Sequence, residues 1–222
     1  MGIALNRMLH TQINTMRVAA FDMGTRNFAF CVEEYEPLEG RPVKAQFDAD
    51  GCATDVYQTY LDTQVYPRGR LVEMQCIDLK QYCESQSISN LYLGLTGVLN
   101  AYTRLWDAVD VFLIEQQMAY GHNKANIQAL RLAQHTLSYF LTIYGPFRRI
   151  QEFPSTHKTR ILGCPRTERR THKSRKIFSV QLATRILSGR NDPLYPTLRT
   201  ASKQDDVSDC VLMIQAHKAL GG

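Results

Sequence analysis

The stretch RVAAFDMGTRNFAFCV, residues 17–32, places an aspartate at the end of an apolar strand. Residues 18–22 and 28–33 have strand-like composition, and the DMGTRN turn between them predicts a β-hairpin. An ionised carboxylate is costly in a buried strand unless it is paired, hydrogen-bonded or bound to a metal. Asp22 therefore requires a partner from elsewhere in the chain.

Further acids follow apolar segments in the same way. VDVFLIEQQ, residues 109–117, is typical of a buried parallel strand and contains Glu115. The stretch KQDDVSD opens a predicted helix over 203–220, and its Asp206 and Asp209 lie three residues apart on one face. The alternative for Asp205 and Asp206 is a capping role that opposes the helix dipole.

The carboxylates of the two strands and the helix are expected to converge at one edge of a sheet. Such a cluster repels itself unless cations lie between its members, and oxygen ligands suit Mg²⁺ or Mn²⁺. Two such ions about 4 Å apart can activate water and stabilise the leaving oxygen in phosphodiester hydrolysis. The pattern therefore predicts a nuclease-like metal site.

The rest of the chain reads as alternating strands and helices around a single domain over 17–222, preceded by a loose tail over 1–16. A polar insertion at about 36–70 is expected to include a strand. We expect, in chain order, a strand at 72–79, a helix at 88–108, a helix at 123–144, a short strand stopped by Pro154, a basic loop and a helix at 172–187. A loop with Gly189, Pro193 and Pro196 is expected between that helix and the last one.

The composition predicts an ordinary soluble globular protein. Of the 222 residues 44% are apolar and 21% are charged. No apolar run reaches the roughly 18 residues of a membrane span, and nothing resembles a secretory signal. The six scattered cysteines form no CxxC pair, which indicates reduced thiols.

Positive charge is concentrated in one segment. The net charge is +5, but residues 148–190 contain twelve Lys or Arg against two acids, which gives +10 locally and leaves −5 for the rest. A solvated surface normally mixes its signs, so this segment indicates a polyanionic partner such as nucleic acid.

Three motifs resemble one family of enzymes. FDMGTRNFAFC resembles the first-strand motif of mitochondrial and poxvirus-type Holliday junction resolvases. FLIEQQMAYGHNKANIQALRLAQ resembles the corresponding strand and helix of bacterial RuvC-type resolvases, and KQDDVSDCVLMIQAH resembles the closing helix of both. The resemblance covers most of residues 17–219, but not the 36–70 insertion. It implies an α/β, RNase H-like fold, with a mixed five-stranded sheet flanked by helices, acting as a homodimer on four-way DNA.

The resemblance also implies roles for particular residues. Two Mg²⁺ or Mn²⁺ ions per site would be held by Asp22, Glu115, Asp206 and Asp209, with Asp205 left open. An active-site lysine is expected near the start of the penultimate helix, as Lys173 or, in another register, Lys176; we favour Lys173. Met118 or Tyr120 stands where relatives carry a wedge at the junction centre. The basic residues expected to contact DNA are Arg169, Arg170, Lys173, Arg175, Lys176, Lys124 and Arg131.

The predicted function is metal-dependent resolution of four-way DNA junctions by paired symmetric cuts. The alternatives are an RNase H-like nuclease on another substrate, such as an RNA–DNA hybrid, and a non-catalytic junction-binding module. DMGT also resembles the phosphate loop of actin-like and sugar-kinase ATPases, but the second Gly-rich loop of those proteins is missing. We expect no membrane association, a dimer interface on the 123–144 helix around Tyr139, Phe140 and Ile143, and action in the cytoplasmic virus factory of a large DNA virus, with the mitochondrion as the alternative.

Overall fold

A mixed five-stranded sheet forms the centre of the protein. The computed structural model describes residues 15–38, 40–85, 87–117 and 127–222. The strand order is β3-β2-β1-β4-β5, in which β1 pairs antiparallel with β2 and parallel with β4. The strands are β1 (Met16–Asp22), β2 (Phe28–Tyr35), β3 (Arg70–Ile77), β4 (Val111–Gln116) and β5 (Arg149–Pro154). The predicted hairpin, parallel strand and sheet class are confirmed.

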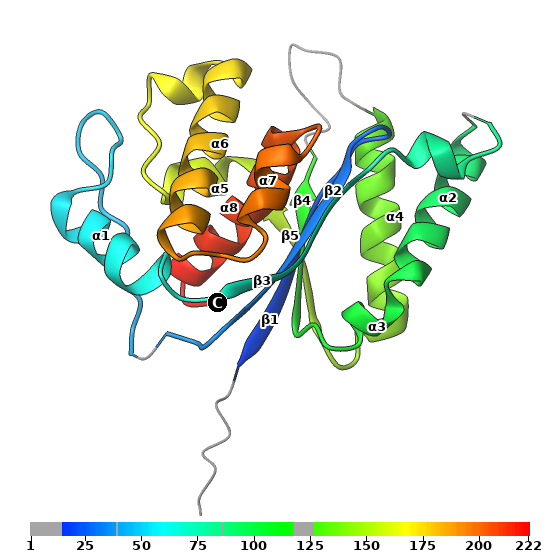
Figure 1. The fold of residues 1–222 in the computed structure, drawn as a ribbon, viewed down its shortest axis with the longest axis horizontal. Coiled ribbons are helices and arrows are strands. Elements are labelled where there is room, and N and C mark those ends of the chain that lie inside the picture. The colour runs from blue at the N-terminus through cyan, green and yellow to red at the C-terminus, as the bar shows by residue number, and fades with distance from the viewer. Residues whose placement is uncertain (1–14, 39, 86, 118–126) are drawn as a thin grey trace, which may run out of the picture.

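Helices cover both faces of this sheet (Figure 1). One layer consists of α1 (Asp55–Tyr60), α5 (Ser155–Ile161), α6 (His172–Gly189), α7 (Tyr195–Thr200) and α8 (Gln204–Ala219). The other consists of α2 (Ile88–Ala101), α3 (Thr103–Trp106) and α4 (Ile127–Tyr144). The short turns are η1 (Leu61–Val65), a π-helix, and η2 (Leu79–Tyr82) and η3 (Glu168–Arg170), both 3₁₀-helices. No helix in the described ranges is long and apolar enough to cross a membrane.

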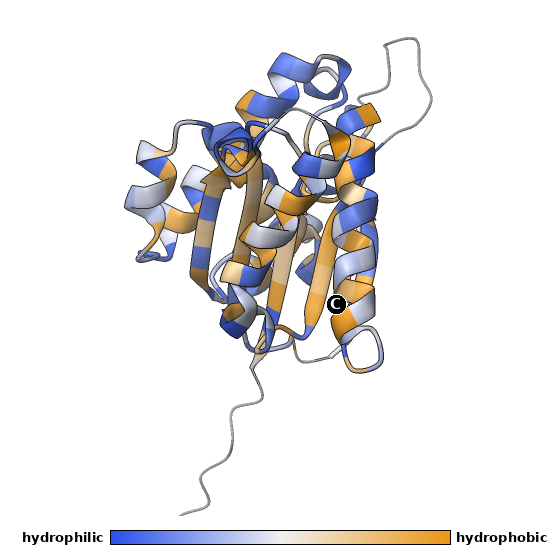
Figure 2. Cartoon of the chain, turned by 90° about the vertical axis from the view of Figure 1, so that its right-hand side faces the viewer, coloured by the Kyte–Doolittle hydropathy of each residue, from blue (hydrophilic) through white to orange (hydrophobic). Residues whose placement is uncertain are grey.

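Strand alternation divides the core between the two layers. In β1, Val18 and Ala20 pack in the core beneath α8, whereas Ala19 and Phe21 pack beneath α2 and α4. Figure 2 shows hydrophobic residues concentrated in the strands, with many hydrophilic residues on the helices around them. Because side chains alternate along a strand, the residue after Phe21, which is Asp22, belongs to the α8 side.

The layer of α2, α3 and α4 is packed with aromatic rings. Phe140 of α4 is fully buried, and its ring centroid lies 4.3 Å from that of Phe112. Phe140 therefore belongs to the core of its own subunit, which corrects its assignment to a dimer interface. The predicted helix over 88–108 is also wrong at one point: Tyr102, with φ −105° and ψ 16°, separates α2 from α3.

Three further expectations about elements are corrected. In the described part of 36–69 there is no strand, only an isolated bridge between Phe47 and Ala53, then α1 and η1, and β3 begins at Arg70. Tyr57, Leu61 and Val65 are buried there at a four-residue spacing, which suits a helix rather than a strand. The loops predicted after β5 and α6 contain α5 and α7, and residues 123–126 of the predicted long helix lie outside the described residues.

A buried set of four charges joins β2 to the end of α8. Glu33 of β2 accepts hydrogen bonds from both Nη atoms of Arg190, at 3.1 Å each, and from Nζ of Lys218 at 2.9 Å. Asp192 pairs with Arg190 and accepts from the backbone N–H of Leu71. We call Glu33, Arg190, Asp192 and Lys218 the closing cluster.

Candidate active site

Two of the predicted acids lie side by side at the ends of parallel strands. Phe21 of β1 is opposite Ile114 of β4, so Asp22 and Glu115 are the next residues along each strand. Val111 and Leu113 of β4 pack in the α8-side core, so alternation directs Glu115 to that same side. Glu115 is only 7% exposed. Strand geometry alone therefore brings two carboxylates into one buried place.

Lys158 lies between this pair and α8. Its Nζ donates to Oε1 of Glu115 at 2.7 Å and lies 2.7 Å from Oδ2 of Asp209. Lys158 comes from α5, which begins directly after β5, the strand that pairs with β4. We call Asp22, Glu115, Lys158 and Asp209 the strand-end cluster. Sequence reasoning missed Lys158, because it is one of twelve basic residues in 148–190 and lies in the part of that segment for which a loop is predicted.

The strand-end cluster carries more negative than positive charge. Burial, reinforced by the charge of Glu115, raises the pKa of Asp22 well above its usual range, and the two carboxyl groups share a hydrogen bond. Burial opposes ionisation of Glu115, but the Lys158 ammonium and hydrogen bonds from its neighbours outweigh it and lower the pKa of Glu115. Glu115 and Asp209 likewise raise the pKa of Lys158 despite its burial. The Lys158 ammonium thus offsets only part of the repulsion among three carboxylates.

The other two acids of α8 contact a different lysine. Nζ of Lys176, on α6, donates to Asp205 and lies 3.5 Å from Oδ1 of Asp206. Burial, followed by the charge of Asp205, raises the pKa of Asp206 to about 6. Lys173 is exposed in the first turn of α6. Of the two lysine registers, the fold brings Lys176 to the acids.

The side-chain oxygens at this site are of the kind that bind a divalent cation, although they are not arranged around one metal position. Within the described ranges, no three Asp, Glu, His or Cys side chains are placed to hold one metal ion. Three of the expected ligands are instead divided between two ion pairs: Glu115 and Asp209 contact Lys158, and Asp206 contacts Lys176. The strand-end cluster nevertheless offers oxygen donors with excess negative charge, which is what Mg²⁺ or Mn²⁺ prefers.

The residues expected to contact DNA differ in exposure. Arg170 and Lys173 are exposed beside the start of α6, and Arg131 is exposed on α4. Arg169 is half-buried, and Nη1 of Arg175 donates to its backbone carbonyl at 2.8 Å. Lys124, Met118 and Tyr120 lie outside the described residues.

Comparison with known proteins supports the fold. No protein-family model matches the chain. The uncharacterized protein 97L of Invertebrate iridescent virus 3 is 28% identical over 215 residues, which cover 91% of this chain and all of that protein. The yeast mitochondrial Holliday junction resolvase Ydc2 superimposes with a TM-score of 0.55 at 14% identity, covering 93% of this chain and 80% of Ydc2. RuvC of Thermus thermophilus superimposes with a TM-score of 0.50 at 12% identity, covering 89% and 92%. The chain therefore has the α/β fold of these two proteins.

Proposed function

We propose that the protein is a metal-dependent endonuclease that resolves four-way DNA junctions by paired symmetric phosphodiester hydrolysis. The observation that carries this proposal is the strand-end cluster: Glu115 and Asp209 contact one buried lysine, and Asp22 lies beside Glu115 at the end of the neighbouring strand. The similar fold of a named Holliday junction resolvase supports the choice of substrate. The basic segment that leads into α6 supplies the positive surface that a branched DNA requires.

The residues of the strand-end cluster divide in this proposal into three metal ligands and one positioning lysine. Asp22, Glu115 and Asp209 would hold one or two Mg²⁺ or Mn²⁺ ions, with Asp206 at the second position. When bound, such ions supply Lewis-acid stabilisation of charge that develops on the phosphate oxygens. Lys158 orients Glu115 and Asp209 through its two 2.7 Å contacts. Lys176 holds Asp205 and Asp206 in the same way from α6.

The homodimer is part of the proposal, because one site cuts one strand and a four-way junction needs two cuts in fixed relation. Phe140 lies in the core, and Tyr139 packs against it and donates a hydrogen bond to Asn100 of the same chain. The apolar residues left for an interface at the end of α4 are Leu141 and Ile143, which are 47% and 46% exposed. Phe147, just beyond the helix, is 79% exposed. Sedimentation at low micromolar concentration tests this: Ile143→Glu should yield monomers that nick a cruciform plasmid without linearising it. A wild-type monomer would contradict the dimer.

The similarity to a viral protein favours a viral origin over a mitochondrial one. A virus factory in the cytoplasm is accordingly the proposed place of action.

One experiment distinguishes this function from its alternatives. The protein is incubated with a synthetic four-way junction, a linear duplex and an RNA–DNA hybrid, each with and without Mg²⁺. We expect symmetric cuts in the junction alone, and only with Mg²⁺. Cleavage of the hybrid instead would assign another RNase H-like nuclease, and tight junction binding without cleavage would assign a binding module.

A further inference from the structure

A rigid hairpin occupies residues 46–54, within the segment that the family resemblance does not cover. The carboxylate of Asp48 accepts hydrogen bonds from the backbone N–H groups of Asp50 and Cys52, at 2.9 Å each. The hairpin closes where the N–H of Thr54 donates to the carbonyl of Gln46 at 3.0 Å. A turn whose amides are held by a side chain in this way keeps a defined shape.

The hairpin is also anchored to the core. The ring of Phe47 packs edge-on against that of Tyr57, with centroids 5.7 Å apart, and Tyr57 is fully buried in α1. The position of the hairpin is therefore fixed relative to the sheet.

The tip of this hairpin lies against the basic loop, which we define as residues 162–171 between α5 and α6. The backbone N–H of Arg166 donates to the carbonyl of Asp50 at 2.7 Å. Gly51 is buried beneath the loop: a Cβ there would lie 2.8 Å from Cγ of Arg166 and would meet Nη2 of Arg169. The absence of a side chain at Gly51 is what allows the two arginines to lie where they do.

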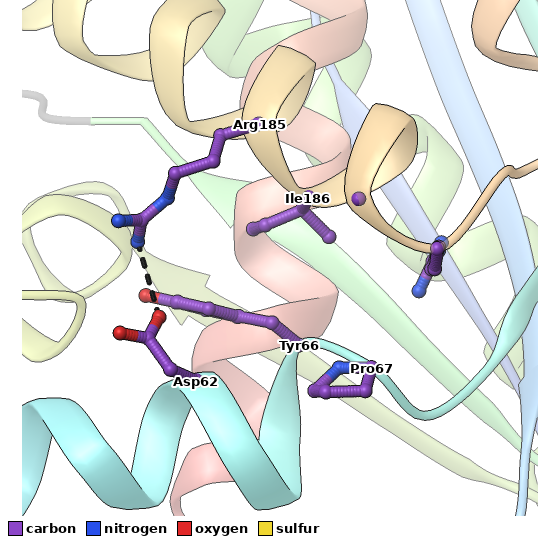
Figure 3. Close-up of a pocket in the computed structure, with 7 residues that line it drawn as sticks. Asp62, Tyr66, Pro67, Arg185 and Ile186 are labelled. Carbon is purple, nitrogen blue, oxygen red and sulfur yellow. Dashed lines mark hydrogen bonds and ion pairs between the residues drawn. The ribbon is translucent and has the colours of Figure 1, made fainter.

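A second contact holds the far end of α6. Nη2 of Arg185 lies 3.4 Å from Oδ1 of Asp62, and its guanidinium lies 5.5 Å from the ring centroid of Tyr66 (Figure 3). Asp62 belongs to η1, and Tyr66 is the residue directly after η1. Both side chains line a cavity of about 330 Å³. The segment from the hairpin to Tyr66 therefore contacts both the basic loop and α6.

These contacts separate the basic residues into two groups. Arg169 is half-buried over Gly51, and its Nε is buried without a hydrogen-bond partner in the described part of the chain. Arg166, Arg170 and Lys173 are exposed along the same loop and the first turn of α6. Arg169 is thus placed to support the loop, while the three exposed residues are placed to contact phosphate.

We propose that the 46–54 hairpin positions the basic loop for the DNA backbone, with Gly51 as its critical residue. This inference rests on the proposed function. A loop that is already ordered binds without losing conformational freedom at that moment, whereas a loose loop loses affinity. The hairpin thus determines how tightly the junction is held and leaves the chemistry of the strand-end cluster unchanged.

Gly51→Ala tests the proposal, with Gly40→Ala as its matched control. Both glycines have left-handed backbones, with φ of +81° and +83°, but a Cβ on Gly40 meets nothing within 4 Å. Both variants therefore bear the same backbone strain, and only Gly51→Ala disturbs the arginines. At 0.1 M salt we expect Gly51→Ala to bind a synthetic junction about tenfold more weakly than Gly40→Ala. The loss of one phosphate contact flattens the slope of log affinity against log salt by about 0.9, which corresponds to about tenfold in affinity between 1 M and 0.1 M salt.

Cleavage at saturating protein separates positioning from a general defect, because both variants should cut bound junction at the wild-type rate. Equal affinities for the two variants would overturn the proposal, as would a slower cut in the bound state. Should Gly51→Ala fail to fold, Asp48→Ala decides, since it loosens the exposed turn without adding a side chain under the loop: wild-type affinity there overturns the proposal. If the wild-type protein itself does not bind junctions, it is the proposed function that fails.

Discussion

The closing cluster and the strand-end cluster are both buried groups of charges beside α8, yet they are built on opposite principles. Glu33 and Asp192 face Arg190 and Lys218, two acids with two bases. The strand-end cluster sets three carboxylates against the single ammonium of Lys158. A balanced cluster has satisfied its charges internally, whereas an unbalanced one retains the capacity to bind a cation.

Hydrogen bonding shows the same contrast. Glu33 accepts from Arg190, Lys218 and, at 2.8 Å, from Nε2 of Gln215. In the strand-end cluster, burial and the charge of Glu115 hold the pKa of Asp22 well above its usual range, so the ionised form of Asp22 is not fully satisfied by its surroundings. Full satisfaction is what a structural charge requires, because an unpaired buried charge costs several kcal/mol. We therefore interpret the closing cluster as structural and the strand-end cluster as functional.

The largest effect should come from removing charge in the strand-end cluster. Asp22→Asn, Glu115→Gln and Asp209→Asn should each slow junction cleavage by at least about 10³-fold, or about 4 kcal/mol in the barrier. The free energy of unfolding should not fall for Asp22→Asn, because the change relieves repulsion among like charges. Glu152→Gln, an exposed carboxylate on β5, is the control and should retain full activity. Normal cleavage by one of the three would remove that residue from the site.

Removing one charge from the closing cluster should act on stability alone. Glu33→Gln leaves the buried Lys218 without its carboxylate and Arg190 with Asp192 alone, so we expect the free energy of unfolding to fall by about 3 to 5 kcal/mol. The neighbouring Glu34 pairs with Arg17 at a partly exposed position, so Glu34→Gln should change the free energy of unfolding by less than about 1 kcal/mol. Urea unfolding measures both. Cleavage per folded molecule should stay normal, and its loss in Glu33→Gln would contradict the structural interpretation.

The pH dependence of stability should follow the same carboxylate. Burial alone would raise the pKa of Glu33, but Lys218 and Arg190 hold it at about 2. A lowered pKa means that its contribution is complete above the unfolded value near 4.5 and is lost as the pH falls through about 2. That contribution is about 3 kcal/mol. Urea unfolding should therefore show that the free energy of unfolding falls more steeply from pH 6 to 2.5 in the wild-type protein than in Glu33→Gln/Lys218→Met. The same pH dependence in both proteins would contradict this role of Glu33.

Strand positions were the part of the site that could be predicted from sequence. Asp22 and Glu115 each end an apolar run, and strand alternation with parallel pairing then places them together. Asp209 could be predicted as well, because it lies on the face of the last helix that carries Asp206. These inferences need only local periodicity.

Helix orientation was the part that could not be predicted. Lys158 reaches the strand-end cluster only because α5 begins at Ser155, after a proline that was interpreted as a stop. The choice between Lys173 and Lys176 depends on which face of α6 is turned toward α8. Ser179 is buried, and Lys176 lies one turn before it on the same face of α6. Tertiary packing, which no local pattern encodes, settles such positions.

The smallest effect, and the sharpest test of the contrast, should come from Mg²⁺ acting on two lysine variants. Lys158→Met and Lys218→Met both remove a buried ammonium, and both should lower the free energy of unfolding without Mg²⁺. In Lys158→Met, three carboxylates lose the cation that competes with a metal ion, so Mg²⁺ should bind more tightly there than in the wild-type protein. If the dissociation constant falls tenfold, saturating Mg²⁺ should narrow the stability gap between Lys158→Met and wild type by about 1.4 kcal/mol. Lys218→Met leaves an excess of only one carboxylate, because Arg190 still pairs with both Glu33 and Asp192, whereas Lys158→Met leaves three carboxylates with no base among them. The difference in the free energy of unfolding between Lys218→Met and wild type should therefore be the same with and without Mg²⁺.

Urea unfolding of all three proteins in Mg²⁺ and in EDTA measures both stability gaps. Identical gaps for Lys158→Met under the two conditions would mean that charge imbalance at the strand ends does not create a cation site.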